Sequence, residues 1–369
     1  MKNIIICCDG TSNDFGDRNS NVVKLFSVLA KDQIRQIVYY DPGVGTPSTY
    51  DAFNPVTKKL MYAFGQGFGY GLSDNIMDAY RFLMQCYKEG DRVYLFGFSR
   101  GAYTVRAVAG LLHTCGLLYD HNENLVSEAM RIYHDRGTKI ADRFKKTFCR
   151  PCPVYFLGLW DTVTSVGRLY NPLLLQATTN NPDVKIIRHA IAIDERRAFF
   201  RQNLWGNKHE EMQDIKQVWF AGSHSDVGGS YPLDRSGLSN ISLEWMIAEA
   251  MDKGILIDDL AEARQVVGHI SNPELQDINE ELKGGWYIAE IWPKLVWVKR
   301  LQKGGKSQWK SKPYLNLGRP RFITSDATLH ESVLLRLQQR PDYRPKNLLR
   351  KIEVAEVAKR HPVEPWKRL

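Results

Sequence analysis

Ser99 lies at the centre of a short motif that can build a serine nucleophile. The motif is Gly97-Phe98-Ser99-Arg100-Gly101, a G-x-S-x-G sequence between an apolar run at 92–98 and a helical pattern at 102–112. A strand-to-helix turn with glycines on both sides presents a serine hydroxyl above the edge of a sheet, where a base can reach it. We therefore expect Ser99 to be a nucleophile.

A serine hydroxyl needs a histidine as base and a carboxylate that orients this histidine. In α/β-hydrolases the acid and then the histidine follow the serine along the chain. Nine histidines all lie beyond Ser99, and His224 is the one that directly follows a short aromatic strand within a glycine-rich loop. Asp161 is the expected acid because it ends the apolar strand 154–160. Asp226 is the rival acid, with shaping of the histidine loop as its other possible role.

Acyl transfer also needs backbone amides that stabilise an oxyanion. The amide of Arg100, next to the serine, is one expected donor. The second donor is expected from the turn Asp9-Gly10-Thr11 after the first strand, with Gly10 and Thr11 as donors and Asp9 in support. The alternative is the loop 43–46, which reads Gly-Val-Gly-Thr.

Six motifs in this order resemble one known family. They are Asp9-Gly10-Thr11 with Asn13, the loop 43–46, the segment 97–103, Leu159-Trp160-Asp161-Thr162-Val163, Asp194-Glu195-Arg196-Arg197 and the segment 222–229. Over residues 2–251 the chain is similar to an α/β-hydrolase domain family whose best-known members are type VI secretion phospholipase effectors. The resemblance implies a triad of Ser99, Asp161 and His224 that hydrolyses phospholipid acyl esters. It also implies structural roles for Asp194 and Arg197, as supports of the histidine loop.

The elements that must position these side chains alternate between strands and helices. Strands are expected at 2–8, 36–40, 92–98, 154–160, 185–193 and 217–221, and helices at 72–87, 102–112 and 243–251. Continuous apolar strands separated by helices are typical of a parallel sheet that is covered on both faces. The sequence thus predicts an α/β-hydrolase-like fold with a mostly parallel sheet. Each motif lies at the carboxyl end of a strand, where such sheets bind ligands.

Charge and pattern divide the 369-residue chain at about residue 284. Residues 285–369 carry 19 Lys and Arg against 7 Asp and Glu, a net +12, whereas residues 1–284 carry −3. We expect a catalytic domain over 1–284 and a basic extension of unassigned fold over 285–369, with helices at 332–339 and 347–360. Basic residues interleaved with aromatic ones suit a lipid interface, so peripheral membrane contact is expected here and nucleic-acid binding is not. The aromatic residues are Trp286, Trp292, Trp297, Trp309 and Tyr314.

The chain shows no signal peptide and no membrane span in its sequence. The first apolar run ends at Asp9, and no stretch reaches the ~20 apolar residues of a span. A cytoplasmic location is expected, with secretion without a cleaved signal as the alternative. The cysteines are then reduced, including the pair in Cys149-Arg-Pro-Cys152. The triad chemistry requires no metal or organic cofactor.

Three functions remain open at this point. The first is a lipid-ester hydrolase, and the second is an esterase or thioesterase that acts on soluble acyl substrates. Lipases carry mobile apolar lids, for which 52–71 and 169–180 are candidate segments, with ordinary core insertions as the alternative. The third function is a non-catalytic binding module with a basic tail, and the complete set of Ser99, Asp161 and His224 argues against it.

Overall fold

The computed structural model describes most of the chain. The described residues are 1–10, 16, 18–43, 71–135, 137–163, 167–168, 171–172, 175–206, 209–268, 270–284, 286–291, 294–301, 307–349 and 353–369. For 167–168, 171–172, 210, 286, 288–289, 294–301 and 307–314 the description covers the backbone alone.

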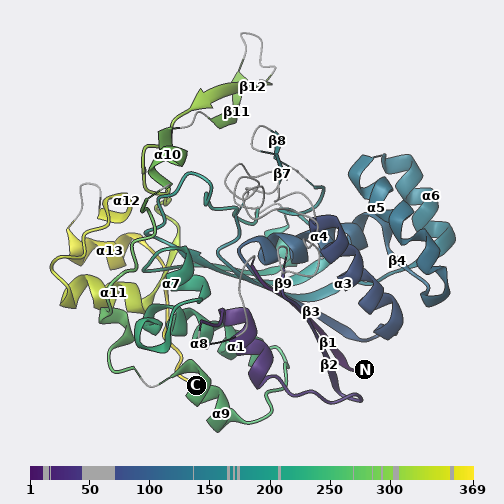
Figure 1. Ribbon diagram of the computed structural model, residues 1–369, viewed down its shortest axis with the longest axis horizontal. Helices are drawn as coiled ribbons and strands as arrows, with labels where there is room; N and C mark the ends of the chain where they lie inside the picture. The colour runs from purple at the N-terminus through teal and green to yellow at the C-terminus, as the bar shows by residue number, and fades with distance from the viewer. Residues whose placement is uncertain are drawn as a thin grey trace.

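An eight-stranded sheet forms the centre of the molecule (Figure 1). Its strand order is β14-β13-β10-β9-β6-β3-β1-β2. The strands are β1 (Asn3–Cys8), β2 (Gln36–Asp41), β3 (Arg92–Phe98), β6 (Val154–Trp160), β9 (Val184–Ala192), β10 (Asp214–Phe220), β13 (Thr328–His330) and β14 (Val363–Glu364). All pairings in this sheet are parallel, so the carboxyl ends of its strands lie along one edge. The predicted α/β-hydrolase-like fold is confirmed.

Helices cover both faces of the sheet, as expected. One face packs against α3 (Leu72–Cys86), α4 (Arg100–Cys115), α5 (Val126–Asp135) and α6 (Thr138–Phe148). The other face packs against α1 (Asn21–Val28), α8 (Gly237–Met251) and α9 (Leu260–Val267). Successive residues of β1 alternate between these two cores, with Ile4 and Ile6 in the first and Ile5 and Cys7 in the second. Because this strand is buried on both faces, its sequence is a continuous apolar run.

Short elements connect the main ones. The helices are α7 (His224–Gly228), α10 (Trp286–Ile291), α11 (Glu331–Gln339), α12 (Lys346–Leu349) and α13 (Val354–Arg360). Single 3₁₀ turns lie at Glu210–Met212, Leu233–Arg235 and Pro273–Leu275, and a longer 3₁₀ segment, kinked at Asn122, lies at Asp120–Leu125. Among the described residues, three antiparallel pairs stand apart from the large sheet: β4 (Leu117–Leu118) with β5 (Cys149–Arg150), β7 (Gly167–Arg168) with β8 (Asn171–Pro172), and β11 (Lys294–Leu301) with β12 (Ser307–Tyr314).

The C-terminal region contributes to the same sheet as the rest of the chain. After α10 and the projecting β11–β12 hairpin, the chain returns as β13 beside β10, and β14 pairs with β13 (Figure 1). A third apolar cluster joins side chains of β9 and β10 to Leu329, Val333 and Val357. The helix expected at 332–339 is α11, and the one expected at 347–360 corresponds to α12 and α13. Residues 315–369, for which we expected no particular fold, therefore complete the sheet and its core.

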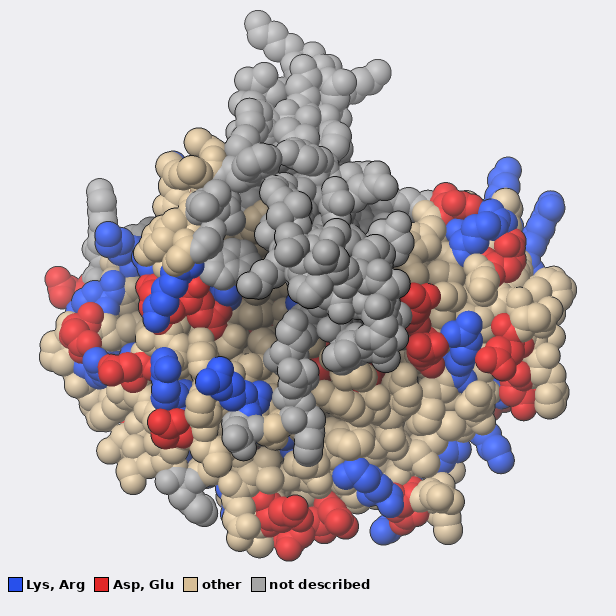
Figure 2. Space-filling view, in the orientation of Figure 1, with Lys and Arg blue, Asp and Glu red and all other residues tan. Residues whose placement is uncertain are grey.

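Ion pairs join the basic C-terminal region to the rest of the chain. Figure 2 shows Lys and Arg side chains interspersed with Asp and Glu over the described part of one face. Among the described residues, six pairs connect the two regions: Arg321–Asp161, Arg340–Asp277, Lys367–Glu249, Lys367–Asp252, Arg368–Glu244 and Lys216–Glu364. The net +12 of the C-terminal region is thus partly matched by carboxylates of the net-negative remainder.

Several predictions fall on residues outside this description. They include the loop at 44–46, the candidate lid at 52–70 and parts of the candidate lid at 169–180. The side chains of Trp286, Trp292, Trp297, Trp309 and Tyr314 also lie outside it, so membrane contact through them stays a prediction. Among the helices that are described, none has the length and apolar character needed to cross a bilayer.

Candidate active site

Ser99 occupies a sharp turn between β3 and α4. Its backbone has φ 58° and ψ −116°, a conformation that costs an L-residue free energy and persists only where surrounding contacts impose it. The flanking glycines allow the turn to close. A Cβ atom on Gly101 would lie 2.1 Å from the carbonyl oxygen of Cys8, and one on Gly97 would lie 2.5 Å from that of Gly101. Only glycine fits these two positions, so the motif predicted from the sequence has the geometry of a nucleophile elbow.

The structure brings Ser99, His224 and Asp161 together. The Nε2 atom of His224 lies 2.8 Å from Oγ of Ser99, and its Nδ1 atom lies 2.6 Å from Oδ2 of Asp161. The three side chains come from the ends of β3, β6 and the loop after β10, and all are buried. In this arrangement Nδ1–H donates to the carboxylate and leaves Nε2 as an acceptor for the serine proton.

Asp161 is held as a carboxylate. Its Oδ1 atom accepts a hydrogen bond from the backbone amide of Ala192 at 2.9 Å, and Arg321 donates to both of its oxygens. Burial alone would raise the pKa of Asp161. The charge of Arg321 and the hydrogen bonds from His224 and Arg321 outweigh burial and lower this pKa well below its ordinary value. Asp161 therefore stays ionised wherever the protein is folded near neutral pH.

His224 is the first residue of α7, and carboxylates hold the start of this short helix. The amide of His224 donates to Oε2 of Glu195 at 3.2 Å, and the amide of Ser225 donates to Oε1 of Glu281 at 3.1 Å. Ser223 and Asp226 form a capping box around the same turn. Because the first amides of a helix lack intrahelical acceptors, these contacts fix the backbone that carries the imidazole.

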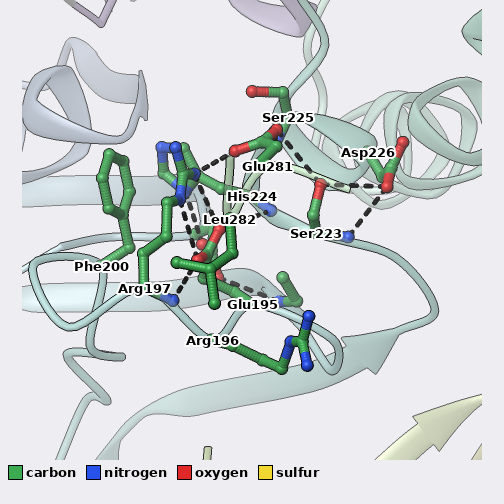
Figure 3. Close-up of polar contacts among 12 residues, drawn as sticks. Glu195, Arg196, Arg197, Phe200, Ser223, His224, Ser225, Asp226, Glu281 and Leu282 are labelled. Atoms are coloured by element: carbon green, nitrogen blue, oxygen red, sulfur yellow. Dashed lines mark hydrogen bonds and ion pairs between the residues drawn. The ribbon is translucent and has the colours of Figure 1, made fainter. Parts of the chain in front are cut away.

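Arg197 links the two glutamates beneath the histidine (Figure 3). Its guanidinium donates to both oxygens of Glu195, to Glu281, and packs 3.6 Å from the ring centroid of Phe200. Burial alone would raise the pKa of Glu195, but the hydrogen bonds and charge of Arg197 lower it. Glu195 and Arg197 thus form a buried ion-pair network with Glu281 at the start of α7, and Arg197 lies where the expected support of the histidine loop would be.

Asp194 lies behind the loop that precedes His224. Its Oδ2 atom accepts hydrogen bonds from the amide of Gly222 at 2.8 Å and from the hydroxyl of Tyr343 at 2.9 Å. Burial raises the pKa of Asp194 to about 6. Asp194, which lies two residues beyond the end of β9, therefore supports the histidine loop.

Asp226 contacts other groups than the imidazole of His224. Its carboxylate accepts hydrogen bonds from the amide and hydroxyl of Ser223 and from the backbone and side chain of Asn279. Burial raises its pKa to about 6. Of the two candidate acids, Asp161 is the one that the structure places on His224, and Asp226 shapes the loop.

The turn after β1 lies beside the elbow, because Gly101 packs directly against the carbonyls of Cys8 and Asp9. Asp9 is buried and accepts hydrogen bonds from Ser20 and Tyr40, and the amide of Gly10 donates to Oδ1 of Asp9 at 2.6 Å. Thr11 lies outside the described residues. Arg100 is the first residue of α4, directly after Ser99.

Arg321 and Glu281 contact this site, but the sequence analysis did not identify them as site residues. Arg321 lies 160 residues beyond Asp161, in the stretch Gly318-Arg319-Pro320-Arg321, which has no periodicity and matches no motif. Glu281 lies in an irregular segment between α9 and α10. Only the tertiary fold brings them near His224, so no local signal marks them. In the part of the chain that is described, no group of three or more His, Cys, Asp or Glu side chains could hold a metal ion.

Comparison with known proteins gives the family. Residues 2–249 match the family model described as type VI secretion system (T6SS), phospholipase effector Tle1-like, catalytic domain. The chain belongs to this family. The Tle1-like match makes the protein a hydrolase of the phospholipase type, and it agrees with the resemblance that the motifs predicted.

Individual relatives of this Tle1-like protein are distant. It is 25% identical to the uncharacterized protein YEL023C of Saccharomyces cerevisiae, with 94% of this chain and 80% of the yeast protein covered. It is 19% identical to an uncharacterized protein from Pseudomonas aeruginosa of known structure, with a TM-score of 0.43. This match covers 73% of the present chain but only 49% of the Pseudomonas chain. The structure of the Tle1 effector bound to the VgrG spike matches with 17% identity and a TM-score of 0.42, over 73% of this chain and 76% of that one.

Proposed function

We propose that this protein is a serine hydrolase that cleaves carboxylic esters of lipids through an acyl-enzyme on Ser99. The observation that supports this most directly is the pair of contacts of His224, 2.8 Å to the serine hydroxyl and 2.6 Å to the Asp161 carboxylate. These are hydrogen-bond distances for a base and the group that orients it.

The reaction runs in two halves. In the first, Nε2 of His224 takes the proton of Ser99 as Oγ attacks the ester carbonyl, and the tetrahedral intermediate collapses when His224 returns that proton to the departing alcohol. In the second, His224 takes a proton from water, whose oxygen attacks the acyl-serine. The acyl–Oγ bond then breaks, Ser99 recovers its proton from His224, and the free acid leaves. Asp161 remains an anion throughout and stabilises the imidazolium.

The oxyanion needs donors on the side of Ser99 that faces the ester carbonyl. We assign one donor to the amide of Arg100, because it follows the nucleophile at the start of α4. The second donor belongs to the turn after β1, since Gly101 packs against that turn. Within this turn the Gly10 amide already donates to Asp9, and Thr11, the other expected donor, lies outside the described residues.

We propose lipid acyl esters as the substrate class, since the family is one of phospholipase effectors. A fluorophosphonate probe and a phospholipid assay test the proposal together. The wild type should be labelled at one site, lose that label in Ser99→Ala, and release fatty acid from phospholipid micelles. Labelling without lipid hydrolysis, combined with turnover of monomeric short-chain esters or thioesters, would identify a soluble-substrate esterase instead. A folded wild type that resists labelling would refute a serine hydrolase.

A further inference from the structure

The guanidinium of Arg321 lies buried against the carboxylate of Asp161. Arg321 belongs to the segment between β12 and β13, and it is 1% exposed. It lies well beyond residues 2–249, the part of the chain that matches the phospholipase family model. A charged contact to the acid therefore comes from outside the recognised catalytic region.

Arg321 connects three parts of the chain. It donates to both oxygens of Asp161, to the carbonyl of Ala192 at the end of β9, at 3.0 Å, and to the carbonyl of Phe200. With the Ala192 amide and His224 Nδ1, the two carboxylate oxygens of Asp161 accept four hydrogen bonds. Four acceptor directions are about what a carboxylate offers, so its orientation is fixed.

Arg321 is also linked to an aromatic neighbour of the imidazole. The ring of His224 packs against Phe98 and Phe200, with centroid distances of 4.6 and 4.8 Å. The backbone of Phe200 is anchored through its carbonyl to Arg321. One guanidinium thus restrains both the acceptor for Nδ1 and an aromatic wall of the histidine.

We propose that Arg321 is a positioning residue of the Ser99 hydrolase, which holds Asp161 and Phe200 in the arrangement that aligns His224 with the serine. The proposal rests on the function proposed above. The hydrogen bonds of Arg321 go to Asp161, Ala192 and Phe200, so its effect on the histidine passes through Asp161 and Phe200.

The charge of Arg321 has a second, separable effect. When His224 takes the serine proton, Asp161 favours the imidazolium and the nearby cation of Arg321 opposes it. The other charged neighbours are Glu195, which is paired with Arg197, and Glu281. His189 lies behind Asp161, and burial together with the charge of Arg106 lowers its pKa well below the ordinary value. Asp194 and Asp226, with pKa values of about 6, contact the histidine loop and are the same in the wild type and in the Arg321 and Arg188 variants.

Two substitutions separate geometry from charge. Arg321→Lys keeps the charge but loses the fork that matches a carboxylate, and Arg321→Gln loses both. We expect Arg321→Gln to lower kcat about 100-fold with KM changed less than about threefold, since the residue is remote from substrate. The acid limb of its kcat/KM profile should move to higher pH by about one unit, because the imidazolium is no longer opposed. Arg321→Lys should recover about tenfold in kcat and keep the acid limb of the wild type.

Arg188 provides the matched control. It is also 1% exposed, lies in β9 and pairs with Glu249 and Asp214, away from the triad. Arg188→Gln should lower the melting temperature at least as much as Arg321→Gln does, yet leave the acid limb in place. Rates are referred to the concentration of sites that react with the fluorophosphonate, so that unfolded protein does not count.

The outcomes separate this proposal from the function on which it rests. If Arg321→Gln and Arg321→Lys retain wild-type kcat and pH profile per reactive site, the positioning role is refuted while the serine hydrolase stands. The same holds if Arg188→Gln shifts the acid limb equally, because the effect is then one of general stability. If the folded wild type has no reactive serine, the proposed function itself fails. If only one of the two Arg321 variants yields no reactive sites, the other variant provides the test. If both Arg321 variants lose their reactive sites and Arg188→Gln keeps them, the proposal is supported.

Discussion

The backbone amide of Ser99 donates a hydrogen bond of 3.0 Å to the carbonyl of Trp160, the residue that precedes Asp161. The pattern continues across the sheet, because the amide of Asp161 donates to Ala190 and that of Ile193 to Phe220. Main-chain hydrogen bonds thus tie the turn at Ser99, the turn at Asp161 and the strand that leads to the His224 loop. Hydrogen bonds that continue the sheet just past the ends of its strands therefore set the relative positions of Ser99, Asp161 and His224.

The strained backbone at Ser99 should lower the stability of the fold, and replacing Ser99 by glycine should relieve this strain. Both Ser99→Ala and Ser99→Gly should lose turnover and fluorophosphonate labelling. Glycine tolerates φ 58° and ψ −116° without a Cβ clash, so Ser99→Gly should be more stable than Ser99→Ala by about 1 kcal/mol. Thermal unfolding of the two inactive proteins checks this, and equal melting temperatures would show that the turn is unstrained.

Replacement by asparagine should affect activity strongly at Asp161 and weakly at Asp226. Asp161→Asn should lower kcat by about 10⁴-fold, since the amide favours the wrong imidazole tautomer. It should also destabilise the fold by roughly 3 kcal/mol or more, because buried Arg321 loses its counter-charge. Asp226→Asn should cost far less activity, as its carboxylate binds Ser223 and Asn279. A larger kinetic loss in Asp226→Asn than in Asp161→Asn would reverse the assignment of the acid.

The close approach of α4 to β1 makes Gly101 irreplaceable. A Cβ at this position meets two backbone carbonyls, at 2.1 and 2.5 Å, that cannot move without disturbing the sheet. Gly101→Ala should therefore lose more than about 3 kcal/mol of stability or fail to fold. Gly137→Ala is the control, because its nearest neighbour is a side-chain carbon 3.9 Å away, and it should change stability by less than about 1 kcal/mol. Similar losses in the two variants would contradict the packing argument.

The buried carboxyls of Asp194 and Asp226 predict how stability depends on pH. Burial raises the pKa of each to about 6 in the folded state, above the ordinary value, so the folded protein binds more protons. Each contributes stability that is fully present below about pH 4 and is lost as pH rises through 6, up to roughly 3 kcal/mol. Asp194→Asn keeps an acceptor for Gly222 and Tyr343 without the charge. Its melting temperature relative to wild type should therefore rise between pH 5 and pH 8.

Asp277 serves as the control for this pH series. Its side chain is 90% exposed and pairs with Arg340 at the surface. The difference between Asp277→Asn and wild type should stay constant from pH 5 to pH 8. If Asp194→Asn shows the same flat difference, its carboxyl is not the source of the proton linkage.

The sheet and the three candidate catalytic side chains could be predicted because their signals are local. Buried parallel strands read as apolar runs, and their carboxyl ends must meet at one edge, so Ser99, Asp161 and His224 were expected near one another. Strand limits were less accurate: β10 begins at Asp214, earlier than the expected 217, because its first half is partly exposed and polar. The three-residue β13 and two-residue β14 are too short to show a period. Arg321 could not be predicted, since its partner is distant in sequence and only tertiary packing joins them.

The distance along the chain between Asp161 and Arg321 also has a consequence in time. A ribosome that adds about 5–20 residues per second incorporates Arg321 roughly 10–30 s after Asp161, since 160 positions separate them. During that interval the nascent chain can already contain Ser99, Asp161 and His224 but not yet Arg321. If Arg321 acts as proposed, the hydrolase gains full activity only once the segment that carries Arg321 and the strands that follow it, β13 and β14, have docked. An enzyme that degrades lipids then has low activity while it is still being synthesised.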